Sequence, residues 1–328
     1  MTGTTGLTAP ASDDAGGAAA RVWPSASPIT YRRANEADFT PTYDVMLRAT
    51  GDLNRQHARL EPGGSHTPQG RAMVYRRFAL RHDGDRFWVA EAGDEVVGFG
   101  VATQRDHVWH LTSLHVVPEL QGRGVGRELL RRCMAAAPPG TNFTTISDAV
   151  NPVSNALYGR LGMLPQAALL YLEGPTQVPD VATRLTLRPF AAGRPDPALL
   201  DPVDLAVLGI HRHADHESWA ATPTTHGYTV LRRGACVGYA YADETGPIGP
   251  IAVRRPEDLA PAVRLALGEA HRLGAPSATL RIPGPARSAI GMLLGFGFRY
   301  GEAIMLLLTQ RPWGRLDRYV SSPADALF

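Results

Sequence analysis

Cysteine is scarce in this sequence: among 328 residues only Cys133 and Cys236 occur, one in each half. Two distant cysteines provide neither a disulfide framework nor the closely spaced ligands of a structural zinc site. Apolar runs long enough to cross a bilayer are also missing. The first residues lack the basic start and apolar stretch of a secretory signal. These absences predict a cytoplasmic protein without a membrane partner.

An excess of one charge is missing as well. Lys and Arg total 33 and Asp and Glu total 31, so the formal net charge is only +2. A global field that would attract nucleic acid is therefore not expected. The length suits two domains of ordinary size, and a hydrophobic fraction of 44% is typical of globular proteins. Residues 1–27 are rich in small and polar side chains and are expected to form a disordered leader.

Internal similarity organises the rest of the chain. Trp88–Gly100 and Tyr228–Ala240 each show a strand, a glycine turn and a second strand. A glycine followed by an apolar strand recurs in Leu161–Leu172 and Phe296–Leu307. Hairpins can recur by chance in any α/β protein, but these segments keep the same order in both halves. We therefore predict two copies of one α/β domain, at residues 28–173 and 183–310, with a linker at 174–182 and a tail at 311–328.

A glycine-rich loop between a strand and a helix is the most informative segment. Leu114–Val117 predicts a buried strand that Pro118 ends, and Arg127–Ala135 has helical apolar spacing. Between them, Gln121–Gly126 reads QGRGVG. Glycines allow successive backbone N–H groups to point into one concavity, and the following helix N-terminus favours negative charge.

This loop predicts a site for a pyrophosphate bound through the main chain. Arg123 and Arg127 could add positive charge. A Walker loop would require Gly-Lys-Ser/Thr, which is absent, and a dinucleotide fingerprint has a different glycine spacing.

Val116-Val117-Pro118 followed by QGRGVG resembles the acetyl-CoA signature Q/R-x-x-G-x-G/A of the GCN5-related N-acetyltransferases (GNATs). A second family element is found in Asn151–Met163, where Asn155 and Tyr158 stand as in the family and Met163 replaces the usual Phe. The resemblance covers residues 29–173 and, as a degraded second copy, residues 183–310. It implies an α/β (α+β) fold of two tandem GNAT-like domains. Each has a mixed, mostly antiparallel twisted sheet flanked by helices, with a splayed central parallel strand pair.

The resemblance also implies roles for individual residues. The pantetheine arm of acetyl-CoA would lie in the splay along the main chain of Val116 and Val117, where an amide N–H would stabilise the oxyanion. Tyr158 is the candidate general acid, and a core aromatic is the alternative. Asn155 would contact CoA or an ordered water; alternatively it is a polar group at the start of a helix capped by Asn151. The predicted cofactor-binding residues are Leu114, His115, Val116, Val117, Gln121, Gly122, Arg123, Gly124, Val125, Gly126, Arg127, Asn155 and Tyr158.

The candidate general base is His110. Many relatives carry a Glu at this position, counted back from Gln121, and histidine titrates near neutrality. From the period of two in a strand we expect His110 and Leu114 to share one face and His115 to lie on the other. A surface or core histidine is the alternative, and an amine that arrives neutral needs no base.

The second copy is predicted to keep the scaffold and lose the chemistry. Side chains replace the glycines, Glu257 and Asp258 would repel a pyrophosphate, and a proline removes a donor. The replacements, on an alignment of Val253 with Val116, are Leu259, Pro261 and Val263 for the glycines and Leu293 for Tyr158. Its expected work is to pack against the first copy and close the acceptor cleft.

Two features of the second half remain. His211, His213 and His216 do not have the spacing of a metal site, so no metal is predicted, and a polar patch near the acceptor cleft or a solvated helix end is expected instead. The aromatic residues Trp313, Tyr319 and Phe328 in the tail predict docking on the domain body or on another subunit.

These features predict an enzyme that transfers an acetyl group from acetyl-CoA to a primary amine of a small molecule, by direct attack in a ternary complex. No nucleic acid or membrane partner is expected, and the protein would be a monomer or homodimer. A protein lysine or N-terminal acetyltransferase and a non-catalytic acetyl-CoA sensor or scaffold are the alternatives. Substrate choice is expected in residues 38–85, where Gly51-Asp52, Glu61–Gly64 and His66 are interpreted as loops.

Overall fold

The computed structural model describes residues 28–57 and 69–323. The predictions for the leader at 1–27, for Glu61–Gly64 with His66, and for the last tail residues from 324 onward lie outside this range. Within it, every helix is too short or too polar to cross a membrane.

The first half consists of a strand, two helices, a hairpin and a strand–loop–helix unit, followed by two further strands with a helix between them. Its elements are β1 (Ile29–Arg33), η1 (Glu36–Asp38), α1 (Phe39–Gln56), α2 (Gln69–Asp83), η2 (Gly84–Arg86), β2 (Phe87–Ala92), β3 (Glu95–Arg105), β4 (Val108–Val116), η3 (Pro118–Leu120), α3 (Val125–Met134), β5 (Asn142–Asp148), α4 (Pro152–Gly159) and β6 (Leu164–Pro175).

The second half repeats this order and adds a short strand from the tail. Its elements are β7 (Leu185–Pro189), η4 (Ala191–Gly193), α5 (Pro197–Val207), α6 (His213–Ala220), β8 (Thr225–Arg232), β9 (Ala235–Asp243), β10 (Pro247–Val253), η5 (Pro256–Asp258), α7 (Leu259–Arg272), β11 (Ser277–Pro283), α8 (Arg287–Gly295), β12 (Arg299–Thr309), η6 (Leu316–Arg318) and β13 (Tyr319–Val320).

Both predicted hairpins are confirmed: β2–β3 turns at Gly93 and β8–β9 at Gly234, each in the left-handed region that glycine favours. The interpretation of Gly51-Asp52 as a loop is wrong, because both residues lie inside α1. Phe39 and Val45 of α1 are buried against the sheet, and this packing keeps a helix intact through a residue that would otherwise weaken it.

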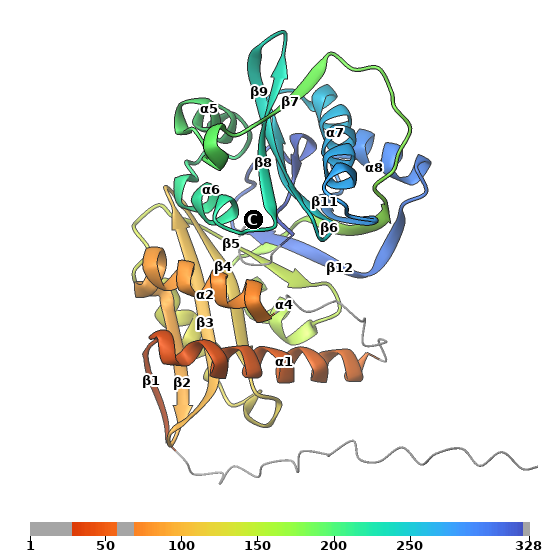
Figure 1. The fold of residues 1–328 in the computed structure, drawn as a ribbon. Coiled ribbons are helices and arrows are strands. Elements are labelled where there is room, and N and C mark those ends of the chain that lie inside the picture. Colours follow the sequence, from red (N-terminus) through yellow and green to blue (C-terminus); the bar gives the residue numbers. More distant parts are fainter. Residues whose placement is uncertain (1–27, 58–68, 324–328) are drawn as a thin grey trace, which may run out of the picture.

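The two copies share one continuous sheet because they exchange their last strands (Figure 1). The strand order is β1-β2-β3-β4-β5-β12-β6-β11-β10-β9-β8-β7. β12 of the second half pairs antiparallel with β5 of the first, and β6 of the first half pairs antiparallel with β11 of the second. The predicted fold class, two tandem copies with mixed and mostly antiparallel pairing, is confirmed, and the exchange joins them.

Helices cover both faces of the sheet. In the first half α1 and α2 lie on one face (Figure 1), and α3 lies on the other, where it approaches β3 closely. A Cβ added to Gly100 would lie 2.9 Å from the Cys133 sulfur of α3, so only glycine allows this approach. In the second half α7 and α8 cover one face, and α5, α6 and the tail cover the other.

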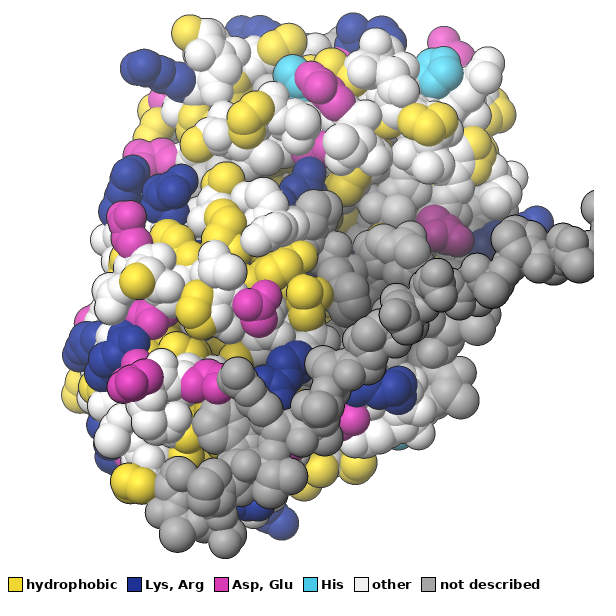
Figure 2. All heavy atoms as spheres, turned by 60° about the horizontal axis from the view of Figure 1, so that its bottom comes forward, with side chains coloured by type: hydrophobic (Ala, Val, Ile, Leu, Met, Phe, Trp, Pro, Cys, Tyr) yellow, Lys and Arg dark blue, Asp and Glu magenta, His cyan; other side chains and the backbone are white. Residues whose placement is uncertain are grey.

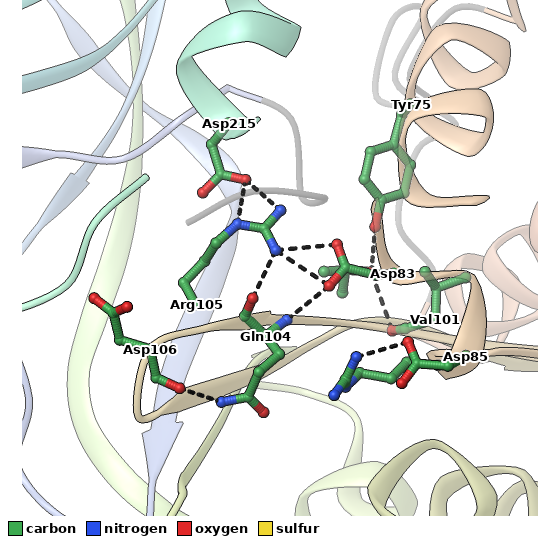
Figure 3. A network of polar contacts seen from close by, with 10 residues as sticks. Tyr75, Asp83, Asp85, Val101, Gln104, Arg105, Asp106 and Asp215 are labelled. Atoms are coloured by element: carbon green, nitrogen blue, oxygen red, sulfur yellow. Dashed lines mark hydrogen bonds and ion pairs between the residues drawn. The ribbon is translucent and has the colours of Figure 1, made fainter. Parts of the chain in front are cut away.

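Ion pairs between α2, β3 and the second half fix the position of the two halves. Arg105 at the end of β3 contacts Asp83 at 3.1 Å and Asp215 of α6 at 2.7 Å, and Figure 3 shows its guanidinium between the two carboxylates. Arg71 of α2 contacts Asp243 of β9 at 2.8 Å. All of these side chains are largely buried, so removal of one partner would leave an uncompensated charge.

Charges of both signs are interspersed on the outer surface. On the face shown in Figure 2, dark blue basic side chains lie next to magenta acidic ones, with hydrophobic side chains between them. This mixture agrees with the formal net charge of +2.

Candidate functional site

The parallel strands β4 and β5 separate partway along their length. They pair from Val108↔Asn142 to Leu111↔Thr145, yet β4 continues to Val116 and β5 to Asp148. A β-bulge at Thr112 coincides with the separation, since Val101 pairs with Ser113 and Ala102 with Leu111. A bulge bends its strand, so it directs β4 away from β5. The splayed strand pair implied by the resemblance is therefore present.

Backbone groups of β4 face this opening. The Val117 N–H donates to the Val97 carbonyl at 2.9 Å and is therefore engaged with β3. Because hydrogen-bonded and non-hydrogen-bonded pairs alternate in an antiparallel ladder, Leu114 and Val116 direct their main-chain groups away from β3, into the opening. An oxyanion donor on this strand thus belongs to Leu114 or Val116, and the N–H of Val117 is not available for that role.

The glycine-rich loop forms a concavity at the N-terminus of α3. Gly122 and Gly124 have φ of 74° and 87°, and a Cβ added to either would meet no atom within 4 Å. Within the described part of the chain, no acceptor receives a hydrogen bond from the main-chain N–H groups of residues 122–127. The Gln121 side chain donates to the Val116 carbonyl at 3.0 Å and ties the loop to the end of β4.

These unengaged donors, together with the helix N-terminus, suit a diphosphate. Arg123 on the loop and Arg127 in the first turn of α3 are exposed and form no ion pair with any described residue. The structure thus brings the predicted residues 121–127 together beside the β4–β5 opening.

The corresponding region of the second half is closed. There η5 leads directly into α7, and Leu259 stands at φ −66° where a left-handed glycine would be needed. Asp258, just before α7, is buried and paired with Arg232. The gap between β10 and β11 contains β13: Ile251 pairs with Val320 on one side and Arg281 bridges Ser321 on the other. The tail therefore docks on its own domain body, one of the two predicted outcomes.

Tyr158 of α4 is buried on the α3 side of the sheet, among Trp109, Leu111, Leu130 and Cys133. Burial raises the pKa of its phenol well above the usual range, so the group stays protonated at neutral pH. A protonated phenol can act as a general acid, as the resemblance implies, although the same surroundings suit a core aromatic.

The start of α4 bears out one prediction and refines another. The Asn151 side chain accepts from the Ser154 N–H at 3.0 Å, which confirms it as the helix N-cap. The Asn155 amide donates to the Asp148 carbonyl at 3.0 Å, while its buried Oδ1 has no hydrogen-bond partner in the described part of the chain. A buried acceptor without a partner is suited to a donor from a ligand or a water.

His110 is buried where β4 and β5 begin to separate. Its Nδ1 lies 2.9 Å from the Thr144 hydroxyl, which itself donates to the Trp109 carbonyl at 3.1 Å. Because that hydroxyl has a single proton, Nδ1 is the donor and Nε2 is the nitrogen able to take a proton. The surface interpretation of His110 is wrong, and a base or a core histidine remain.

The predicted strand parity is wrong beyond Thr112. The extra residue of the bulge inverts the alternation, so Leu114 lies on the α3 side, near Gly100 and Cys133. His110 and His115 lie on the opposite face, where His115 stacks on Phe99 at 5.3 Å. Tyr158 and His110 consequently flank the opening from opposite faces of the sheet.

Sequence reasoning missed Thr112 and Tyr75, whose hydroxyls are hydrogen-bonded to one another at the bulge. A signal for the bulge existed: the apolar residues Trp109, Leu111, Leu114 and Val116 are spaced by two, three and two, so the period breaks once. Tyr75 carried no comparable signal, because it comes from α2 and meets the strand only through the fold.

The three histidines of the second half each bind a carboxylate of their own. His211 contacts Asp106 at 2.9 Å, His213 contacts Asp201 at 2.7 Å, and His216 contacts the buried Asp204 at 2.8 Å; the His216 ring also meets the Tyr241 hydroxyl at 2.7 Å. Among residues 28–57 and 69–323, no group of His, Cys, Asp and Glu is placed to hold a metal ion.

Comparisons with known proteins agree with this geometry. The model of the acetyltransferase (GNAT) family matches residues 53–163. A mycothiol acetyltransferase from Rhodococcus opacus is 30% identical over 144 residues, which is 42% of this chain and 45% of that protein, so the match spans less than half of the relative.

Two solved structures share the fold over most of the chain. A putative acetyltransferase from Pyrococcus horikoshii has a TM-score of 0.71 at 17% identity, covering 94% of this chain and 98% of its own. A tandem GNAT protein from the clavulanic acid biosynthesis pathway has a TM-score of 0.53 at 17% identity, covering 87% and 99%. The family match thus identifies a GNAT domain within residues 53–163, the part of the first half that contains the splay and the loop, and the chain as a whole shares the tandem fold of these solved structures.

Proposed function

We propose that this chain is an acetyl-CoA-dependent N-acetyltransferase that acts on a primary amine of a small molecule, with its working site in the first half. The observation that carries the proposal is the row of unengaged amides at residues 122–127 beside the β4–β5 opening. The diphosphate of acetyl-CoA would bind this loop and the pantetheine arm would follow β4, which places the thioester near the bulge.

The reaction then needs two proton transfers and one charge to be stabilised. The amine nitrogen attacks the thioester carbonyl carbon directly, and the N–H of Leu114 or Val116 stabilises the oxyanion. His110 Nε2 takes a proton from the amine, since Nδ1 is held by Thr144. The carbon–sulfur bond breaks, and Tyr158 supplies the proton to the leaving thiolate of CoA. Tyr158 and His110 lie on opposite faces of the sheet, which suits their opposite roles as proton donor and proton acceptor.

The surroundings of His110 favour a small acceptor. That face of the sheet is covered by α1 and α2, and the second half is held against α2 by the pair Arg71–Asp243 and against β3 by the pair Arg105–Asp215. An enclosed approach of this kind admits a small molecule more readily than the backbone of a folded protein.

The test is release of CoA from acetyl-CoA in the presence of a broad amine panel that includes amino acids, polyamines, aminosugars and lysine peptides. All 33 residues in the Lys and Arg total are arginine, so the chain offers no lysine of its own to acetylate. CoA release in the control without added amine should therefore be low. Turnover of one class of small amine is expected. Tight binding of acetyl-CoA with no turnover on any amine would refute the proposal and favour a sensor.

A further inference from the structure

A pocket lies between the halves, on the acceptor side of the proposed site. One wall is α2, with Arg71 and Tyr75, and the other is the end of α6, with Ser218 and Trp219. Neither wall belongs to the glycine-rich loop or to the residues assigned to the cofactor. The pocket is therefore a separate feature that exists only because the second copy packs against the first.

Trp219 lines this pocket and carries an unsatisfied donor. The residue is 7% exposed, and its buried indole N–H has no hydrogen-bond partner among residues 28–57 and 69–323. The ring is fixed by edge contacts to His216 and Tyr241, at 5.2 and 5.4 Å between centroids, and by the Arg212 guanidinium at 4.9 Å. An indole N–H can only donate, so a ligand group that satisfies it must be an acceptor.

Arg71 brings a positive charge to the same pocket. One terminal nitrogen donates to Asp243 at 2.8 Å, while the other guanidinium nitrogens form no hydrogen bond with described residues. Asp243 is itself held by the hydroxyls of Thr224 and Thr225 at 2.8 and 2.7 Å, so it positions the guanidinium firmly. A guanidinium can bind a second carboxylate through its unused edge.

Tyr75 connects the pocket to the reaction site. Its ring lines the pocket, and its hydroxyl is hydrogen-bonded to Thr112 at the bulge of β4, two residues from His110; Figure 3 shows the side chain extending from α2 toward the strand. Tyr75 therefore links the pocket to the bulge at which β4 turns away from β5.

We propose that this pocket binds a carboxylate of the acceptor, so that the substrate is an amine that also carries a carboxylate group, as an amino acid or a short peptide does. The inference rests on the proposed function. It specifies that Arg71 and Trp219 bind the carboxylate, that Asp243 is a positioning residue for Arg71, and that the amine points toward His110.

The experiment compares matched acceptors on the full-length protein. Amino acids, ω-amino carboxylates and dipeptides are each assayed beside the corresponding amide and the decarboxylated amine. The carboxylate form should have a kcat/KM about ten- to a hundredfold higher, the range expected for hydrogen bonds to a charged group. Trp219→Phe keeps the ring and removes the donor, and Arg71→Gln removes the charge.

Both variants should lower kcat/KM for the carboxylate forms, mainly through KM, by a larger factor than for the matched amides. Arg71→Gln also leaves the buried Asp243 carboxylate without its partner, so the measured quantity is the ratio of kcat/KM between the two acceptor forms. Trp219→Phe should lower it about tenfold. Trp313→Phe is the matched control, because that buried indole donates to the Leu208 carbonyl, away from the pocket, and should not alter the preference. Turnover without a carboxylate preference, or a preference that survives both pocket variants, overturns this inference alone. Absence of turnover on every amine overturns the proposed function, and this inference with it.

Discussion

Gly124→Glu separates the loop's role in binding from its role in folding. Gly124 is the residue before α3, with φ of 87°, and an added side chain would project into the open concavity. Left-handed backbone costs a non-glycine residue about 1–2 kcal/mol of folding free energy. A carboxylate at contact distance from a phosphate adds about 1–4 kcal/mol of repulsion. A repulsion of about 3 kcal/mol would weaken acetyl-CoA binding about a hundredfold.

Gly234→Glu is the matched control, since Gly234 has φ of 82° and an equally open Cβ direction, but lies in the β8–β9 turn of the second half. Both variants should lose a few degrees in Tm, about 2–8 °C, from the shared backbone strain. Isothermal titration with acetyl-CoA should then show a loss of affinity for Gly124→Glu alone. Normal binding of acetyl-CoA by Gly124→Glu would refute a diphosphate site at the glycine-rich loop. An equal loss of affinity in both variants would show that the effect is on folding.

Three further predictions concern single side chains. Tyr158→Phe should lower kcat about a hundredfold or more and leave the acetyl-CoA Kd within about twofold; an unchanged kcat would make Tyr158 a core aromatic. The hydrogen bond to Asp106 raises the pKa of His211, so this pair stabilises the fold at pH values below the ordinary histidine pKa of about 6.5 and loses that effect as pH rises through the raised value. The Tm difference between wild type and Asp106→Asn should therefore shrink with rising pH, and a difference that grows would contradict the assignment. Arg212→Met leaves the buried Asp204 carboxylate without its guanidinium and should cost about 3–5 kcal/mol in urea unfolding; a loss below about 1 kcal/mol would refute the pairing.

The features that could be predicted from the sequence are those encoded locally. A glycine loop between a strand and a helix fixes where main-chain donors gather, and residues 121–127 lie together as expected. The hairpins at Gly93 and Gly234 and the cap at Asn151 are equally local. In each case the side chain, or its absence, decides the conformation of neighbouring residues.

The features that could not be predicted depend on distant partners. β6 and β12 have the apolar composition of strands whichever sheet they join, so their exchange leaves no trace in composition. β13 is only two residues long, too short to produce a periodic pattern. The faces of Leu114 and His115 relative to His110 could not be predicted, because one extra residue in β4 inverts every later position, which a strict period of two does not allow for.

The strand exchange explains why the first copy needs the second, although the second has no cofactor loop of its own. β5 loses β4 as a partner after Thr145, at the point where the opening must form. On its other edge, β12 of the second half continues the pairing, with Leu306 opposite Ser147 and Met305 opposite Asp148. Without β12 this end of β5 would have unpaired backbone groups on both sides, a costly arrangement for a partly buried strand. The second copy therefore supports the outer edge of β5 beside the opening, while its own equivalent gap is filled by β13, so that among the described residues the gap between the central parallel strands stays open in the first half.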